Sequence, residues 1–336
     1  MFLPLAKLFL RLMAFLPLRA NHALGSLLGW LCWVLPNRNR HNTLVNLQLC
    51  FPEMKHSERQ AMARASLIET GKALTETGWL WYRDSKDIQN LIEFPEQQIA
   101  FAGLPKKSSH ENCGQSEDSS QSKDSSQSER LQSTLLITPH FGAWEMCPAA
   151  LAPLKDPVYL YRPPRAIALE PLIKTGRERF GAEMVAVDAA GIKNLLRAVR
   201  RCRPVGILPD QEPDANAGIF ANFFGVPANT MTLLPRLAGK SSARVVCLAI
   251  ERKPKGRGFL VHNVPVEPGI LEQDISIATK ALNQTVEHCV KINPNQYCWS
   301  YRRFRLQPDG SRRDYSARAI WPVSHGSPGE TGHNQG

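Results

Sequence analysis

The sequence predicts an α/β fold with a largely parallel central sheet flanked by helices. After residue 133, short apolar runs rich in β-branched and aromatic residues alternate with stretches of helical period. This alternation is typical of βαβ units, whose helices cover a mostly parallel sheet. The expected strands are 134–138, 158–162, 184–187, 205–208, 244–250 and 259–262. The expected helices are 192–201, 229–240 and 274–291, with another through Ile173 and Arg179.

Length and charge limit the classes of function. The chain has 336 residues, enough for one large domain or two ordinary ones. Lys and Arg number 41 against 30 Asp and Glu, a formal net charge of +11. This balance indicates an anionic partner: nucleic acid, an anionic membrane, a phosphorylated substrate or an acidic carrier protein. The eight cysteines form no CxxC pair, so no zinc or other metal site is expected.

Residues 1–40 are expected to form a membrane anchor built on a hydrophobic helix. Two apolar pieces, 1–18 and 23–36, follow each other, and the first contains two basic residues. Neither piece has the roughly 18 uninterrupted apolar residues that a spanning helix needs. Tryptophans and arginines toward the end of the segment suit a bilayer interface. We therefore expect an interfacial anchor, with a single tilted span as the competing interpretation.

The anchor precedes a main domain, residues 41–315. Within it, residues 106–133 contain the near-repeats SEDSSQ and SKDSSQ and hardly any apolar side chains. Such a segment cannot bury enough surface to offset the entropy lost on ordering. We expect a disordered insertion there and a disordered C-terminal tail over 316–336.

The stretch TLLITPHFGAWE, residues 134–145, carries the first candidate catalytic pair. Pro139 ends the expected strand, His140 stands at its exit, and a helix is expected to start just before Glu145. Residues five apart on one helix point about 140° from each other, so the two side chains meet only across such a break. A carboxylate there holds one imidazole nitrogen and leaves the other free as a general base. The alternative is a surface histidine and a glutamate favoured at a helix N-terminus.

Two further polar residues stand at the ends of expected strands. Arg162 is the last residue of the expected strand 158–162, and Asp210 follows the expected strand 205–208, as His140 follows its own strand. In parallel α/β sheets the site lies beyond the carboxyl ends of the strands. The sequence therefore predicts one cleft that collects His140, Arg162 and Asp210.

The segment FANFFGVPANTMTLLPRLA, residues 220–238, combines aromatic rings with a turn signal. Phe223, Phe224 and Gly225 precede an expected helix with Asn229 or Thr230 as its N-cap. This loop and helix start are a candidate contact for an acyl chain. The alternative is a packed loop.

Arginines alternate with aromatic residues in WSYRRFRLQPDG, residues 299–310. Arg302 and Arg303 are candidates for substrate binding, because guanidinium groups bind phosphate in a bidentate manner. A solvated basic face is the alternative.

Together these segments resemble the late acyltransferases of lipid A biosynthesis, the bacterial lauroyl and myristoyl transferases. That family lies within the glycerolipid acyltransferase superfamily, whose motif is His-x4-acid. The similar blocks stand in the family's order and span most of residues 1–310. They are NTLVNLQLCFPEM (42–54), TPHFGAWE (138–145), YLYRPP (159–164), LPDQ (208–211), FFGVPANTMTLLPRLA (223–238) and WSYRRF (299–304).

The resemblance implies a glycerolipid acyltransferase-like fold and a reaction. A fatty acyl group would pass from acyl carrier protein to a hydroxyl of a phosphorylated, Kdo-bearing lipid A precursor in lipopolysaccharide or lipooligosaccharide biosynthesis. His140 would act as general base, with Glu145 fixing its tautomer. Arg162 would bind lipid phosphate or the developing oxyanion, and Asp210 would order the site. The carrier-protein thioester serves as donor, and no cofactor is implied.

The resemblance also implies partners and a place in the cell. The expected partners are acyl carrier protein, the lipid A precursor and inner-membrane phospholipids of a Gram-negative bacterium, with the catalytic domain on the cytoplasmic side. No nucleic acid is expected, because no recognition motif accompanies the basic charge. Two alternatives stay open: an acyltransferase for lysophosphatidate or another membrane lipid, and a basic membrane-associated lipid- or nucleic-acid-binding protein. Ala143 and Gln307 depart from the family, which commonly has asparagine and a basic residue there.

Overall fold

The structure is a computed structural model, and it describes residues 2–94, 133–214, 216–241 and 243–315. The expected insertion, apart from Ser133, and the expected C-terminal tail lie outside the described residues.

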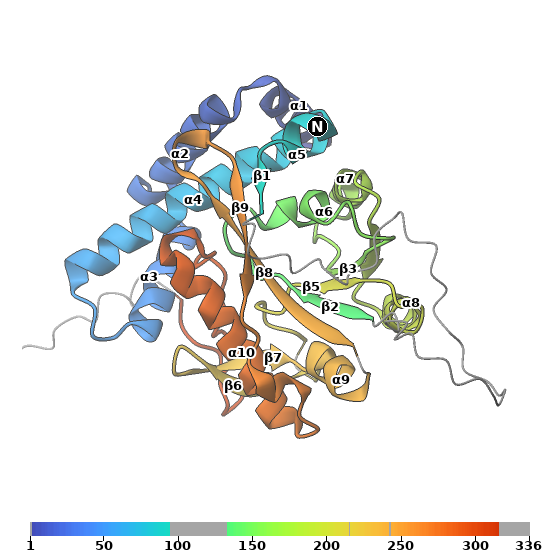
Figure 1. Cartoon of the computed structure of the whole chain (residues 1–336). Helices are drawn as coiled ribbons and strands as arrows, with labels where there is room; N and C mark the ends of the chain where they lie inside the picture. The colour runs from blue at the N-terminus through green and yellow to red at the C-terminus, as the bar shows by residue number, and fades with distance from the viewer. Residues whose placement is uncertain (1, 95–132, 215, 242, 316–336) are drawn as a thin grey trace, which may run out of the picture.

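A seven-stranded sheet forms the centre of the molecule (Figure 1). The strand order is β1-β9-β8-β2-β5-β3-β4, and neighbours are parallel except for the antiparallel pair β8 and β9. The prediction of an α/β fold with a largely parallel sheet is confirmed. The strands are β1 Ile92–Glu93, β2 Thr134–Ile137, β3 Val158–Tyr161, β4 Glu183–Ala186, β5 Val205–Ile207, β8 Arg244–Arg252 and β9 Phe259–Val264.

Helices cover the sheet. Three of the described helices start behind an aspartate, Asp84, Asp188 or Asp274, whose carboxylate accepts from the backbone N–H groups of the first turn. The helices are α1 Phe2–Phe15, α2 Leu18–Val34, α3 Arg38–Cys50, α4 His56–Tyr82, α5 Ser85–Gln89, α6 Cys147–Ala150, α7 Glu170–Glu178, α8 Ala189–Arg200, α9 Leu233–Lys240 and α10 Ile275–Ile292.

Both faces of the sheet are buried, which explains why its strands are continuously apolar. Along β2, Leu135 and Ile137 join one core cluster with residues of α8, α9 and α10. Leu136 points to the opposite face and joins a second cluster with residues of α1, α4 and α6. The two-residue period of a strand therefore divides one apolar run between two cores.

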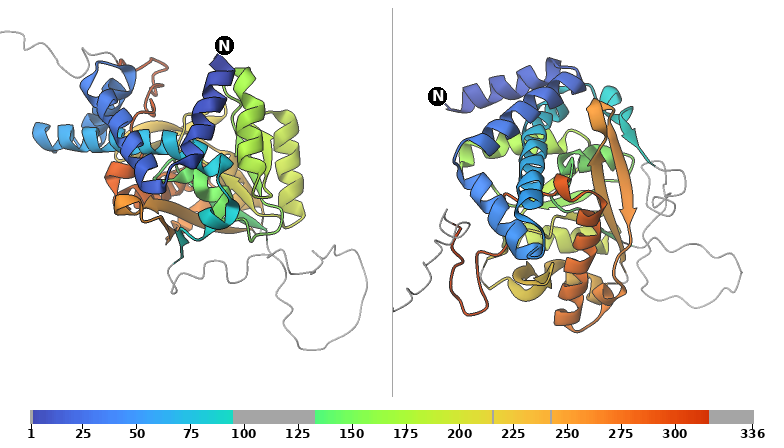
Figure 2. Two further views of the ribbon diagram at one scale, coloured as in Figure 1. Left: turned by 90° about the horizontal axis from the view of Figure 1, so that it is seen from above. Right: turned by 90° about the vertical axis from the view of Figure 1, so that its left-hand side faces the viewer.

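The N-terminal helices gather on one side of the sheet, where α1 and α2 lie along α4 (Figure 2). Glycines let the helices approach: a Cβ on Gly29 would meet the Leu67 carbonyl oxygen at 2.3 Å. Asn21 of α2 also donates to the Thr75 carbonyl across this contact, at 3.1 Å. The segment expected to be an anchor thus contributes to the packed core. In the described ranges we find no helix with both the length and the apolar character to cross a bilayer.

The expected helix over 229–240 is wrong in its first part. A hairpin precedes α9, made of β6 Gly218–Phe223 and β7 Val226–Met231. Its turn residues, Phe224 and Gly225, have φ of 48° and 78°, the left-handed pair that a two-residue hairpin turn requires. Thr230 therefore lies within a strand and caps no helix.

Candidate active site

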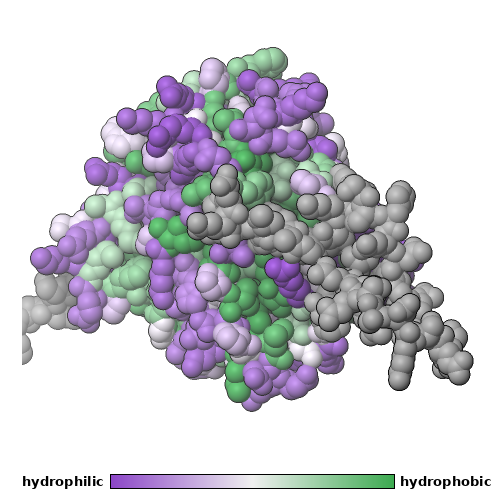
Figure 3. Space-filling view, viewed as in Figure 1, coloured by the Kyte–Doolittle hydropathy of each residue, from purple (hydrophilic) through white to green (hydrophobic). Residues whose placement is uncertain are grey.

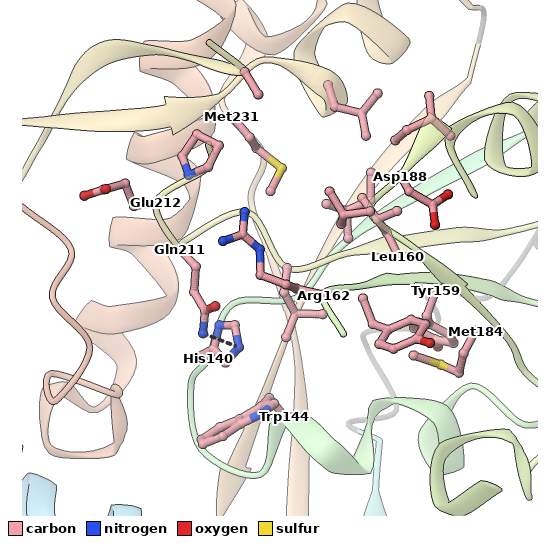
Figure 4. A pocket seen from close by; sticks show the side chains of 18 of the residues that line it. His140, Trp144, Tyr159, Leu160, Arg162, Met184, Asp188, Gln211, Glu212 and Met231 are labelled. Carbon is pink, nitrogen blue, oxygen red and sulfur yellow. Dashed lines mark hydrogen bonds between the residues drawn. The ribbon is translucent and has the colours of Figure 1, made fainter. Parts of the chain in front are cut away.

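A cavity of about 560 Å³ lies beyond the carboxyl ends of β2, β3 and β5, as expected for this type of sheet (Figure 4). One part of its wall is apolar, with Tyr159, Leu160, Met184, Ile192, Ile207, Leu208, Met231 and Leu233. The rest is polar or charged and includes His140, Glu145, Arg162, Arg177, Gln211, Asp214 and Arg236.

His140 enters this cavity from the exit of β2. Pro139 ends the strand, and the backbone N–H of His140 donates to Oδ2 of Asp210 at 2.8 Å. Nδ1 of the same histidine lies 2.8 Å from the other carboxylate oxygen, Oδ1. Because β5 pairs directly with β2, the residue that follows β5 reaches the one that follows β2. One buried carboxylate thus holds both the backbone and the ring of His140.

The hydrogen-bond partner of the second ring nitrogen, Nε2, determines the tautomer of His140. The side-chain amide nitrogen of Gln211 lies 3.0 Å from Nε2 of His140 (Figure 4). An amide nitrogen only donates, so Nε2 accepts and the ring proton sits on Nδ1, donated to Asp210. Burial alone would raise the pKa of Asp210, but the charge and hydrogen bonds of His140 outweigh it and lower that pKa. The carboxylate is therefore ionised, and the ring's lone pair lies on Nε2, where it accepts from Gln211.

Glu145 does not pair with His140 as predicted. Its carboxylate accepts from Nε of Arg177 at 2.9 Å and from Nη2 of the same guanidinium. The expected helix after His140 is replaced by bridges to Tyr297 and Ile250 and one 3₁₀ turn, Trp144–Met146, which directs Glu145 to α7. The orienting role predicted for Glu145 therefore falls geometrically to Asp210.

Glu145 and Arg177 nevertheless border the same cavity as His140. Burial raises the pKa of Glu145, but the charge and hydrogen bonds of Arg177 are stronger and lower it overall. The pair is consequently ionised. Sequence reasoning missed Arg177, because no motif sets it apart from the other arginines of residues 162–203.

Arg162 lies where the sequence placed it. It follows β3 and borders the cavity with His140. Its side chain is about half exposed and contacts Asp214 at 3.1 Å. The predicted cleft thus collects His140 and Arg162 in its wall, with Asp210 behind the histidine.

The other predicted substrate arginines differ from each other. Arg303 is 3% exposed and donates to the Asn229 carbonyl and to Oγ1 of Thr230, both at 2.6 Å. Burial lowers its pKa, and its guanidinium ties the C-terminal segment to β7. Protein atoms therefore accept from both Nη groups of Arg303, and this residue does not border the cavity in which it was expected to bind substrate. Arg302 is exposed but does not border the cavity.

The aromatic residues before the hairpin turn are also structural. Phe223 is 1% exposed, and its ring packs against those of Phe224, Tyr297 and Phe304. Thr230 is fully buried and contacts Arg303. The expected acyl-chain contact at Phe223, Phe224, Gly225 and Thr230 is therefore not part of the cavity wall. The next residue along β7, Met231, does line the cavity.

A buried ionic network supports the loop after His140. Gly142 has φ of 54°, and its carbonyl oxygen accepts from Nη2 of Arg252 at 2.7 Å. Nε of Arg252 contacts both carboxylate oxygens of Glu76, at 2.7 and 2.8 Å. Glu76 in turn contacts Nε2 of His22 at 2.6 Å, and Glu69 lies 3.4 Å from the guanidinium. The network joins α2 and α4 to the loop that follows His140.

Ala143, the departure from the family pattern, faces this network. It borders a small hollow with Glu76, Arg252 and Trp144 and is absent from the cavity wall around His140. Ala143 therefore lies beside the network that supports the loop, and it takes no part in the hydrogen bonds of His140 to Asp210 and Gln211.

The side chains of the cavity form neither a metal-binding site nor an activated cysteine nucleophile in the described ranges. Across the described ranges, no group of three or more His, Cys, Asp or Glu side chains is placed to hold a metal ion. Cys147 borders the cavity, but burial raises the pKa of its thiol, which disfavours the nucleophilic thiolate.

Comparison with known proteins finds relatives that match over most of the chain. Residues 3–306 match the family model described as bacterial lipid A biosynthesis acyltransferase. The chain is 28% identical to the lipid A biosynthesis lauroyltransferase of Escherichia coli K12 over 296 residues, 88% of each chain. It is 24% identical to the palmitoleoyltransferase of the same organism, over 87% of each chain. It is also 24% identical to the myristoyltransferase, over 88% of this chain and 84% of the relative.

Proposed function

The chain belongs to the bacterial lipid A biosynthesis acyltransferase family, and we propose that it moves a fatty acyl group from acyl carrier protein to a hydroxyl of a Kdo-bearing lipid A precursor. One observation carries the proposed mechanism. A histidine with its Nδ1 held by a buried carboxylate presents its Nε2 to a cavity whose walls are partly apolar and partly cationic.

His140 acts as general base in this proposal. Its Nε2 takes the proton of the acceptor hydroxyl as the hydroxyl oxygen attacks the thioester carbonyl. Asp210 accepts a hydrogen bond from the Nδ1–H group and stabilises the imidazolium that forms. The carbon–sulfur bond then breaks, and the imidazolium returns the proton to the departing thiolate. Atoms and charges balance with no acyl-enzyme intermediate, which agrees with the raised pKa of the buried Cys147 thiol.

The two arginines of the cavity wall supply positive charge. Arg177 is fixed by Glu145, and Arg162 is half exposed and held only by the exposed Asp214. A fixed guanidinium stabilises negative charge that develops on the carbonyl oxygen, because it need not reorganise during the reaction. We assign that role to Arg177. We assign to Arg162 the binding of an anionic group of a substrate, since its partner is easily displaced.

Attachment to the inner membrane would bring a lipid acceptor to this cavity. Exposed apolar side chains recur along α1 at Leu5, Leu8, Leu12 and Phe15, a spacing that places them on one helical face. Apolar residues also form the tip where α1 meets α2, at the top of Figure 3. A helix face of this kind lies in a bilayer interface without crossing it. The net positive charge favours the cytoplasmic leaflet and an acidic carrier protein.

An acyl transfer assay tests the proposal. Labelled acyl carrier protein is incubated with wild-type protein and either the Kdo-bearing precursor, the precursor without Kdo, or lysophosphatidate. We expect rapid transfer to the first acceptor only, and a loss of about 10² to 10⁴-fold in His140→Ala.

The matched control is His262→Ala. His262 also pairs with a glutamate, Glu251 at 3.0 Å, but it lies on β9 outside the cavity. The acyl transfer rate of His262→Ala should stay within a factor of two or three of the wild-type rate, about the effect of a surface substitution. Undiminished transfer by His140→Ala would exclude the proposed base, and preferred transfer to lysophosphatidate would exclude the proposed acceptor.

A further inference from the structure

A second hollow, of about 370 Å³, lies at the junction of α2, α4 and the turn between β8 and β9. It shares no residue with the reaction cavity. Its wall holds four cationic side chains and no carboxylate. The lining residues are Arg19, His22, Ala23, Ser26, Lys72, Lys253, Lys255 and Gly256.

Two of the four cations are neutralised by neighbours and two are not. Lys72 pairs with Glu69 and Lys253 with Glu93, each at 2.5 Å. Arg19 and Lys255 are exposed, and neither has an acidic partner in the part of the chain that the structure describes. The hollow therefore presents two positive charges to a ligand.

The turn that supplies Lys255 is held against the start of α2 (Figure 1). Lys255 has φ of 59°, a conformation that is unfavourable for a residue with a side chain. Gly256 follows with φ of 64°, and a Cβ on it would come within 2.9 Å of the Arg19 backbone. Close packing of Gly256 on Arg19 thus places both Arg19 and Lys255 in the wall of the hollow.

The surface of α2 continues from this hollow as an apolar stripe. Leu27, Trp30 and Val34 are each about half exposed. By the helical period of 100° per residue, they share a face with Arg19 and Ala23. A cationic hollow followed by an apolar stripe matches one kind of partner, an amphiphile with an anionic headgroup, and tryptophan is typical of the bilayer interface.

We infer that this hollow binds the phosphate of an anionic bilayer lipid, with Arg19 and Lys255 as its ligands and the apolar stripe of α2 along the lipid chains. The inference extends the proposed attachment to a membrane and does not depend on acyl transfer. It assigns to α2 a headgroup site that is separate from the reaction cavity.

Vesicle flotation with the full chain, in the absence of acyl donor, tests this inference. The probes are vesicles of phosphatidylcholine with or without phosphatidylglycerol. The variant is Arg19→Gln/Lys255→Asn, since asparagine tolerates the left-handed backbone at 255. Loss of two cationic contacts should weaken binding to the anionic vesicles by about 30-fold. Binding to pure phosphatidylcholine should not change.

The matched control is Lys193→Gln/Arg201→Gln, which removes the same charge from exposed positions in and just after α8. It should weaken anionic vesicle binding by less than about three-fold, because these charges lie outside the hollow. Equal losses in the two variants would overturn the inference in favour of diffuse attraction. Loss of inorganic phosphate binding with unchanged vesicle binding would overturn it in favour of a site for free phosphate. Acyl transfer by Arg19→Gln/Lys255→Asn to a detergent-dispersed acceptor should be unaffected. Failure of the lipid-binding proposal can therefore be told apart from failure of the proposed reaction.

Discussion

Two arginine–glutamate pairs lie on either side of the loop that follows His140. Arg177 and Glu145 border the reaction cavity, where their side chains are 25% and 16% exposed. Arg252 and Glu76 lie behind the loop and are 3% and 6% exposed. The chemistry of the two pairs is the same, but only the first can reach a substrate. The comparison shows that position relative to the cavity separates a candidate catalytic ion pair from a structural one.

Breaking the structural pair should have the largest effect on folding. Arg252→Met leaves Glu76 buried without its guanidinium and removes the hydrogen bond to the Gly142 carbonyl. We expect the free energy of unfolding to fall by about 3–5 kcal/mol, as measured by chemical denaturation. A loss below about 1 kcal/mol would mean that the network does not support the loop.

Breaking the cavity pair should act on the reaction more than on folding. Glu145→Gln removes the charge that fixes Arg177, so the transition state loses a preorganised cation. We expect kcat to fall by about 10²-fold and the free energy of unfolding to fall by about 1–2 kcal/mol. Glu183→Gln is the control, because it breaks a surface pair with Arg203 on the rim of β4. Equal kcat in the two variants would assign the Glu145 pair a purely structural role.

Acidification should reduce the contribution of Glu76 to the free energy of unfolding. Burial would raise its pKa, but Arg252 and His22 outweigh this effect, and the pKa is lowered from its usual 4.5. A lowered folded-state pKa gives stability that is complete above pH 4.5 and lost as the pH falls through the folded-state value. The destabilisation caused by Glu76→Gln, measured by denaturation across this range, should therefore shrink toward low pH. A constant or growing difference would contradict the ionised pair.

The smallest effect is expected at Gln211, whose amide occupies Nε2 of His140. An acceptor hydroxyl has to displace this amide before the proton can move. Gln211→Ala should therefore lower the KM for the acceptor by up to about five-fold, the value of one hydrogen bond, with little change in kcat. A KM raised ten-fold would instead make Gln211 a ligand of the acceptor.

The strands and the cleft could be predicted from the sequence because both depend on local pattern. The apolar runs of β2, β3 and β5 and the polar residue after each are visible without tertiary information. The hydrogen-bond partner of His140 could not be predicted in this way. Asp210 reaches His140 because β5 pairs with β2, and the spacing of the two residues along the chain does not show this pairing. The burial of Arg303 could not be predicted for the same reason: an arginine in a basic cluster becomes buried only through its contact with β7.

The hairpin 218–231 was missed because its turn pair, Phe224–Gly225, resembles the loop that precedes a helix. Only pairing with the preceding strand makes these residues a turn.

The protonation state of His140 tests the central claim most directly. Protein labelled with ¹⁵N-histidine, with His140→Gln for assignment, is observed by proton–nitrogen correlation at a pH where the ring is neutral. The account predicts a proton on Nδ1, donated to Asp210, and an unprotonated Nε2 facing the cavity. A proton on Nε2 would contradict it, because the remaining lone pair would then lie on Nδ1, toward Asp210, and could not take the acceptor's proton in the cavity.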